Sequence, residues 1–221
     1  MNFRFTESTG GKSTGAFLSR NLALHVGDHP EIVESNRRSL SDEIGLPVQF
    51  MEQVHGDHVE VIDDYIQPSP TADALVTSNP KMALAVMVAD CIPLLLANQG
   101  SAAAVHVGRK GLLNKIFLKA ITEMRKVDSS PISAVIGPSI CGRCYEVSPE
   151  IFAEVTQLFP RAAAETVQGT PSLDLSAALT FELEKIDIDV LTIARCTVED
   201  SSLYSYRRDG ITGRQAGVIW I

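Results

Sequence analysis

Apolar residues recur at every third or fourth position in four segments of the chain, and this spacing predicts four amphipathic helices. The first is expected from about Pro30 to Ile44, with Asp28 as a candidate N-terminal cap and Gly45 followed by Pro47 as the stop signal. The others are expected over residues 112–126, 148–159 and 175–185. Each helix should bury one face and expose the other.

Short apolar and β-branched runs between these helices predict strands. The runs lie at residues 48–51, 59–62, 83–88, 94–97, 102–107, 132–136, 190–194 and 217–221. Between residues 82 and 107 several of them follow one another without an intervening helix, which favours an α+β fold with a mixed sheet. The stretch Gln67–Thr71 is too short to separate two domains, so we expect residues 1–221 to form a single domain.

Composition and charge argue against nucleic-acid binding, a membrane span and secretion. The formal net charge is −8, and no cluster of basic residues offers the footprint that a nucleic-acid polymer needs. The longest mostly apolar stretch, Met82–Ala97, is interrupted by Asp90 and Pro93 and is shorter than the roughly 20 residues of a membrane helix. The N-terminal residues lack the apolar core of a secretory signal. We therefore expect a cytoplasmic protein with neither a membrane span nor a nucleic-acid partner.

Candidate chemistry centres on Cys91, which lies between apolar strands, with His55 before it and His106 after it. One thiolate and two imidazoles are a ligand set that leaves an open position on zinc. The spacing also allows a small core cysteine and two unrelated histidines. If strands 94–97 and 102–107 are antiparallel neighbours, we expect Cys91 and His106 at opposite ends unless the strands bend. His58 is left outside the ligand set.

Two further motifs carry possible chemistry. Gly108-Arg109-Lys110-Gly111 precedes the helix expected at 112, so backbone N–H groups, a helix dipole and the cations Arg109 and Lys110 make a candidate phosphate cradle. A solvated basic loop is the alternative. Cys141 and Cys144 have the spacing of a redox pair, but the sequence around them suggests a loop that enters a strand, whereas a redox pair needs a helix N-terminus.

The chain resembles the laccase-domain, or polyphenol-oxidase-like, zinc-dependent purine nucleoside phosphorylases. The matching motifs run in family order through nearly the whole chain: Glu52-Gln53-Val54-His55-Gly56, Ala72-Asp73-Ala74-Leu75-Val76-Thr77, Ala89-Asp90-Cys91-Ile92-Pro93-Leu94, Ala104-Val105-His106, Ile136-Gly137-Pro138, Cys144-Tyr145-Glu146-Val147, Tyr204-Ser205-Tyr206-Arg207-Arg208-Asp209-Gly210 and Thr212-Gly213-Arg214.

The resemblance implies a layered α/β/β/α fold with mixed sheets, and one catalytic zinc ion held by His55, Cys91 and His106. It also implies phosphorolysis of adenosine, inosine, guanosine and methylthioadenosine, with adenosine deamination as an additional activity. The partners would be purine nucleosides and phosphate, and the protein a monomer or homodimer. Asp90, beside Cys91, is a candidate for proton transfer or for orienting a ligand, with a structural turn carboxylate as the alternative. Glu52 and Asp73 are weaker candidates.

The chain departs from the family pattern at two places. Where the family usually has His-Ala-Gly-Trp-Arg-Gly, the segment from His106 to Gly111 has lost the aromatic residue and carries Lys110 in place of arginine. Ser8 stands where another arginine is usual. Arginine binds phosphate as a rigid fork and lysine as a mobile point charge, so phosphate binding is expected to weaken unless Arg109 compensates.

Three other readings are open. A copper-dependent polyphenol oxidase would use the same His and Cys donors, although the chain has only five histidines for a multicopper site. A cysteine hydrolase would use Cys91 as nucleophile with a histidine base. A non-catalytic zinc module would result if Cys141, Cys144 or Cys196 filled the fourth position.

Overall fold

Two mixed β-sheets form the centre of the protein, whose 221 residues are all described by a computed structural model. The first sheet has the strand order β1–β12–β5–β2, and the second β11–β8–β6–β7–β4–β3. The bounds of the first are β1 (Asn2–Phe5), β12 (Gln215–Trp220), β5 (Ala83–Val88) and β2 (Val48–Gln49). Those of the second are β11 (Asp189–Thr192), β8 (Ser133–Ile136), β6 (Ile92–Ala97), β7 (Ala102–Val107), β4 (Ala74–Thr77) and β3 (Val59–Val61). A separate ribbon pairs β9 (Ala163–Glu165) with β10 (Pro171–Leu173).

The two sheets face each other across an inner core, as alternation along β5 shows. Leu84, Val86 and Val88 point to the inner core, where they meet Leu95 of β6. The alternate residues of β5, among them Ala85, belong to a second core on the outer face of the first sheet. Successive strand residues point to opposite faces, so a strand buried on both faces has a continuous apolar sequence.

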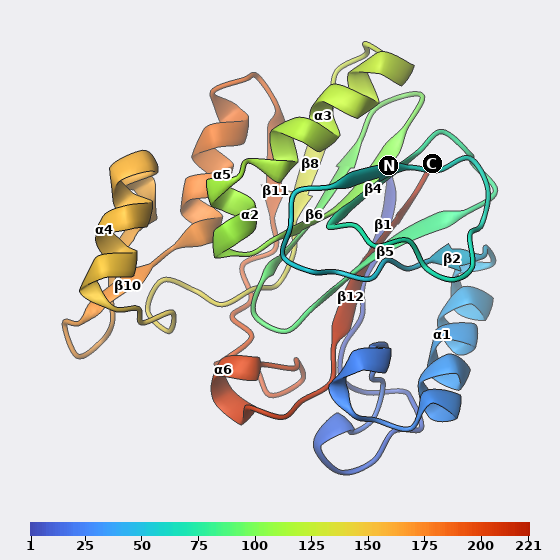
Figure 1. Cartoon of the computed structure of the whole chain (residues 1–221), viewed down its shortest axis with the longest axis horizontal. Helices are drawn as coiled ribbons and strands as arrows, with labels where there is room; N and C mark the ends of the chain where they lie inside the picture. Colours follow the sequence, from blue (N-terminus) through green and yellow to red (C-terminus); the bar gives the residue numbers. More distant parts are fainter.

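Helices cover the two outer faces, which confirms the layered α/β/β/α fold (Figure 1). On the first sheet lies α1 (Pro30–Ile44), which packs there through Leu40 and Ile44. On the second lie α2 (Arg109–Leu113), α3 (Ile116–Val127) and α5 (Leu175–Glu184). Beside them, α4 (Pro149–Leu158) packs against β10. β1 and β12 pair antiparallel, so the two termini lie side by side.

The helices expected at 30–44, 148–159 and 175–185 are confirmed, with only their ends adjusted. The single helix expected at 112–126 is wrong, because Lys115 adopts a left-handed backbone with φ 56° and separates α2 from α3. Asp28 is not the cap of α1: His29 occupies the capping position, and the Asp28 carboxylate accepts from the His29 N–H and from the Asn21 side-chain amide. An apolar spacing that continues through a two-residue break cannot reveal that break.

All the expected strands are present: those at 83–88 and 102–107 have the expected bounds, the one at 94–97 begins earlier, and the others are shorter or shifted. Several short elements were not predicted. These are β1, β4, β9, β10, α6 (Tyr206–Asp209) and the 3₁₀ turns Gly15–Phe17, Leu24–Val26 and Pro160–Ala162. Each spans six residues or fewer and offers too few positions for a periodic signal. None of the helices is long and apolar enough to cross a membrane.

Candidate metal centre

The hairpin of β6 and β7 brings Cys91 and His106 together. In this antiparallel pair Ile92 is opposite Val107 and Pro93 is opposite His106. Cys91 immediately precedes β6, and His106 is near the end of β7. The start of one strand and the end of the next lie at the same end of a hairpin. The expectation that the two residues lie at opposite ends is therefore wrong.

His55 reaches the same place through a loop that one carboxylate organises. Asp73, directly before β4, accepts hydrogen bonds from the backbone N–H groups of Val54, His55 and Gly56 at 3.2, 3.0 and 2.6 Å. His55 has φ 58°, an unusual backbone conformation for a residue with a side chain. Three N–H bonds to one buried carboxylate supply the free energy that such a turn requires.

Asp73 also orients His106. Its Oδ1 lies 2.8 Å from His106 Nδ1, and both side chains are buried. Burial raises the Asp73 pKa, but the hydrogen bonds from His106 and from the Gly56 N–H outweigh burial, and the pKa is lowered. A histidine whose Nδ1–H is donated to a carboxylate presents Nε2 to a metal. Asp73, weighed as a weak candidate from the sequence, is thus the residue that holds two of the three candidate ligands.

The donor atoms of His55, Cys91 and His106 all lie within 4.8 Å of one another, and Cys91 Sγ is 4.0 Å from His55 Nε2. Zinc bonds of about 2.3 Å to sulfur and about 2.1 Å to nitrogen fit between atoms at this separation. A Cβ at Gly108 would lie 2.9 Å from Cys91 Sγ and 3.7 Å from the His55 ring. The space around the three donors therefore requires glycine at this position, and the donor set fits one metal ion with an open side.

Cys91 and His106 shift each other's pKa through their opposite charges. Burial raises the Cys91 pKa, but the two neighbouring imidazoles, His106 foremost, lower it to about 6. Burial lowers the His106 pKa, but Cys91 and Asp73 raise it to about 9. Without a metal the two groups thus form a thiolate–imidazolium pair near neutral pH. With a metal, His106 must give up its proton.

The three donors lie on the wall of a cavity of about 440 Å³, a volume in the range of small-molecule sites. The cavity is also lined by three guanidinium groups, those of Arg109, Arg207 and Arg214. Further lining residues include His25, Gln53, Met87, Tyr145 and Tyr206. Arg207 and Arg214 come from the C-terminal segment, and only their place in family motifs could have drawn attention to them.

The two phosphate candidates from the sequence have different positions. Arg109 lines the cavity and pairs with Glu154 at 3.1 Å. Lys110 is exposed and is not part of the cavity wall. Ser8 is also absent from the wall, and its backbone bonds to Ser202 and Ser19. Glu52 is exposed, beside Thr71.

Asp90 anchors the segment that carries Arg207. Its Oδ1 accepts from the hydroxyls of Thr197 and Ser205 at 2.6 and 2.7 Å, and its Oδ2 accepts from the Arg207 N–H at 2.7 Å. Both carboxylate oxygens are therefore engaged by the protein. This geometry favours the structural reading of Asp90 over the proton-transfer reading.

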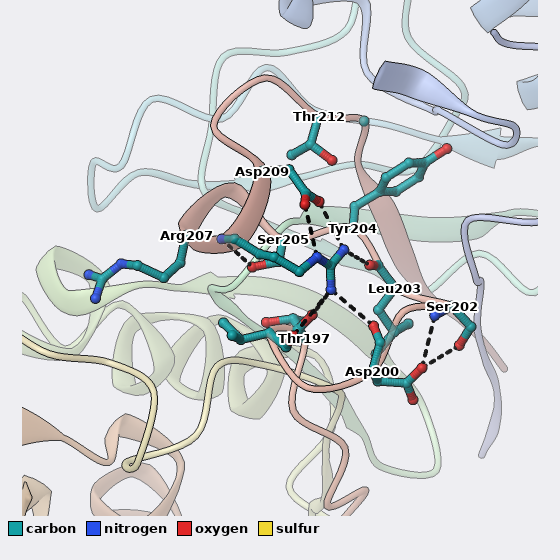
Figure 2. Close-up of polar contacts among 12 residues, drawn as sticks. Thr197, Asp200, Ser202, Leu203, Tyr204, Ser205, Arg207, Asp209 and Thr212 are labelled. Carbon is teal, nitrogen blue, oxygen red and sulfur yellow. Dashed lines mark hydrogen bonds and ion pairs between the residues drawn. The ribbon is translucent and has the colours of Figure 1, made fainter. Parts of the chain in front are cut away.

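A second anchor of this segment is Arg208, whose guanidinium donates to the carbonyls of Thr197 and Leu203 at 2.8 Å each and to the Asp209 carboxylate. Figure 2 shows these partners around the guanidinium, while the Arg207 side chain extends away from them. Arg207 donates instead to the Glu146 carbonyl at 2.9 Å, and its guanidinium lies over the Tyr145 ring. Adjacent arginines thus have separate tasks, one inside the loop and one on the cavity wall.

The remaining cysteines do not complete this centre. Cys141, Cys144 and Cys196 form a group of their own with Glu199, separate from the group of Cys91. No helix begins at Cys144, since α4 starts only at Pro149. Cys141 and Cys144 therefore lack the helix N-terminus that a redox pair needs, as the sequence around them suggested.

Comparison with known proteins identifies the family. A family model described as multi-copper polyphenol oxidoreductase laccase matches residues 2–221. The chain belongs to this laccase-domain family. A Corynebacterium glutamicum relative named purine nucleoside phosphorylase is 43% identical over 98% of this chain and 93% of its own. A Streptomyces coelicolor relative with the same name is 43% identical over 100% of this chain and 95% of its own.

Solved structures of similar proteins agree with the fold. A Neisseria meningitidis protein superposes with a TM-score of 0.90 at 35% identity, over 99% of this chain and 93% of that one. A Geobacillus stearothermophilus protein gives 0.85 at 29% identity, over 98% and 90%. The chain therefore shares its fold with these two proteins over nearly its full length.

Replacing Asp73 by asparagine should weaken metal binding about 10- to 100-fold, because the amide has no negative charge and only one acceptor oxygen for the four hydrogen bonds that hold His106 and the His55 turn. Competition titration with a chromophoric chelator measures the change. The matched control is Glu60→Gln, which alters another carboxylate 2.8 Å from a histidine, the exposed His58. Equal metal affinity in the Asp73→Asn and unaltered proteins would contradict the role given to Asp73.

In chelator-treated protein, iodoacetamide should alkylate Cys91 at a rate that rises as the pH is raised through about 6. The sign follows from the lowered pKa, since the reactive thiolate predominates above it and is lost below it. Peptide mapping by mass spectrometry separates Cys91 from the other cysteines. In urea the midpoint should move to about 8.5. A folded-state midpoint near that value would refute the thiolate–imidazolium pair.

Proposed function

We propose that the protein is a zinc-dependent purine nucleoside phosphorylase. The observation that carries this proposal is the juxtaposition, in one cavity, of an open His-Cys-His donor set with three guanidinium groups. The relatives named purine nucleoside phosphorylase, which match over the full chain, support the substrate class. Adenosine, inosine, guanosine and methylthioadenosine are the proposed nucleosides, and adenosine deamination is a proposed second activity.

The metal would be held by His55 Nε2, Cys91 Sγ and His106 Nε2. A zinc ion in such a set supplies a Lewis acid and an activator of water. The protein contributes the orientation of the ligands: Asp73 fixes His106 and the His55 turn, and Gly108 keeps space beside the sulfur.

Phosphorolysis breaks the bond between ribose C1′ and the purine nitrogen and forms a bond from C1′ to a phosphate oxygen. The phosphate is negatively charged, so it needs cationic hydrogen-bond donors, and guanidinium groups are well suited to bind it. Arg207 and Arg214 are the candidates. Each donates one Nη1 group to backbone carbonyls and keeps other N–H groups for a ligand. Arg207 and Arg214 can bind phosphate where the arginine that the family usually has at position 110 is replaced by lysine.

Two rival functions remain as outcomes of experiment. In metal-free protein, Cys91 could act as nucleophile, His106 as base and Asp73 as the carboxylate that orients the imidazole. This arrangement is the one that favours a cysteine hydrolase. A copper oxidase is suggested by the description of the family model. Stoichiometric copper with oxygen uptake would establish the copper reading, and an acyl-enzyme on Cys91 after metal removal would establish the hydrolase.

The test of the proposed function is incubation of purified, zinc-loaded protein with adenosine, with and without phosphate, and chromatographic separation of the products. Adenine and ribose 1-phosphate should form only with phosphate, and inosine should form without it. The Cys91→Ser protein is the control and should form none of these three products. A zinc-loaded protein that yields no product from any of the four nucleosides would overturn the proposal.

Replacing Arg207 by glutamine should raise the KM for phosphate about tenfold and change the KM for the nucleoside less, because a charge-assisted contact to the anion is lost. Initial rates over a matrix of the two substrate concentrations separate the two effects. Arg38→Gln is the control, since Arg38 is exposed on α1. If both KM values rise equally, the side chain shapes the cavity instead of holding phosphate.

A further inference from the structure

The second cysteine group lies where the two parallel strands β8 and β11 end. After β8 the chain continues to Cys141, and after β11 it continues to Cys196. The two extensions remain side by side, because Ser139 bridges to Cys196 and its N–H donates to the Arg195 carbonyl at 3.2 Å. Parallel strands place their carboxyl ends at one edge of a sheet. Cysteines distant in sequence therefore meet there.

Each extension turns in the same way at its cysteine. The Cys141 carbonyl accepts from the Tyr145 N–H at 3.0 Å, and the Cys196 carbonyl accepts from the Asp200 N–H at 2.9 Å. Both bonds span four residues, so residues three apart fall on one side of each turn. One turn thus presents Cys141 with Cys144, and the other presents Cys196 with Glu199. The sequence pattern is C-x₂-C followed by C-x₂-E.

The donor atoms of these four side chains lie within 4.8 Å of one another. Cys144 Sγ is 3.6 Å from Glu199 Oε1, and the Cys141 N–H donates to Cys196 Sγ at 3.4 Å. Backbone N–H groups that point at sulfur favour the thiolate form that metals bind. All three cysteines are free and partly buried.

We infer that Cys141, Cys144, Cys196 and Glu199 form a second metal site, which binds zinc in a structural role. Four donors on two turns, with two residues between the members of each pair, are the pattern of a closed tetrahedral zinc site. Three thiolates select zinc over magnesium or calcium. A disulfide would use only two of the three sulfurs that meet here.

Local charge and position agree with this role. Arg143 lies between the first two cysteines, and its guanidinium is 3.1 Å from the Glu199 carboxylate, which offsets part of the excess negative charge of the ligands. The site joins the segment that carries Tyr145 to the segment that leads into α6. Arg207 of α6 donates to the Cys144 and Glu146 carbonyls. The second ion would therefore hold one wall of the cavity in place without contacting it.

Elemental analysis of protein purified with a non-thiol reductant, stripped and reloaded with zinc tests the inference. The unaltered protein should bind two equivalents, and Cys91→Ser and Cys196→Ser should bind one each. The double variant should bind none. The Cys91→Ser result depends only on the second site, so it stays informative even if the proposed phosphorylase function fails. Loss of the second ion should also lower the Tm by several degrees.

Cobalt substitution in the Cys91→Ser background gives a second readout, and covers the case in which Cys196→Ser does not fold. The thiolate-to-cobalt absorption should report three sulfurs. Glu199→Cys should raise it by about one third, because four thiolates then replace three. Glu199→Gln should weaken zinc binding, whereas Glu184→Gln, at an exposed glutamate, should leave it unchanged. Absence of zinc from Cys91→Ser, or an intact mass lower by two hydrogens from a disulfide, would overturn the inference.

Discussion

The candidate centre depends on one buried carboxylate. Asp73 accepts three backbone N–H groups from the His55 turn and the Nδ1 hydrogen of His106, so it sets the position of two ligands from opposite directions. A buried carboxylate without such partners would cost several kcal/mol. The same bonds that make its burial tolerable therefore give the site its geometry. Cys91 needs no such support, because the hairpin register places it.

Sequence reasoning succeeded where the physical signal was long. The apolar faces of α1, α4 and α5 and the continuous runs of β5 and β7 extend over six or more residues, and the structure has them at the expected places. It failed where a single residue decides, as at Lys115, whose left-handed backbone splits one expected helix into two. It also underrated Asp73, because a carboxylate before a short strand has no distinctive pattern until its partners are known.

The cavity combines distant parts of the chain, which explains why Arg109 could be assigned to it from a local motif whereas Arg207 and Arg214 could not. The metal donors come from the hairpin and the His55 loop, whereas Arg207 and Arg214 come from the C-terminal segment. Asp90 joins the two parts: it is adjacent to Cys91, yet its oxygens hold Thr197, Ser205 and the Arg207 N–H. A carboxylate that the sequence offered as a candidate for proton transfer thus positions Arg207, the residue proposed to hold phosphate.

The description of the family model and the names of the relatives suggest different chemistry, and the arrangement of donors bears on the choice. Multicopper oxidation requires several copper ions held mainly by histidine. Of the five histidines here, His58 is paired with Glu60 at the surface, and only His55 and His106 join Cys91 in a donor group. Such a group suits one ion beside a cationic cavity. Because phosphorolysis needs an anion held next to a reacting sugar, while phenol oxidation does not, the three guanidinium groups favour the purine nucleoside reading.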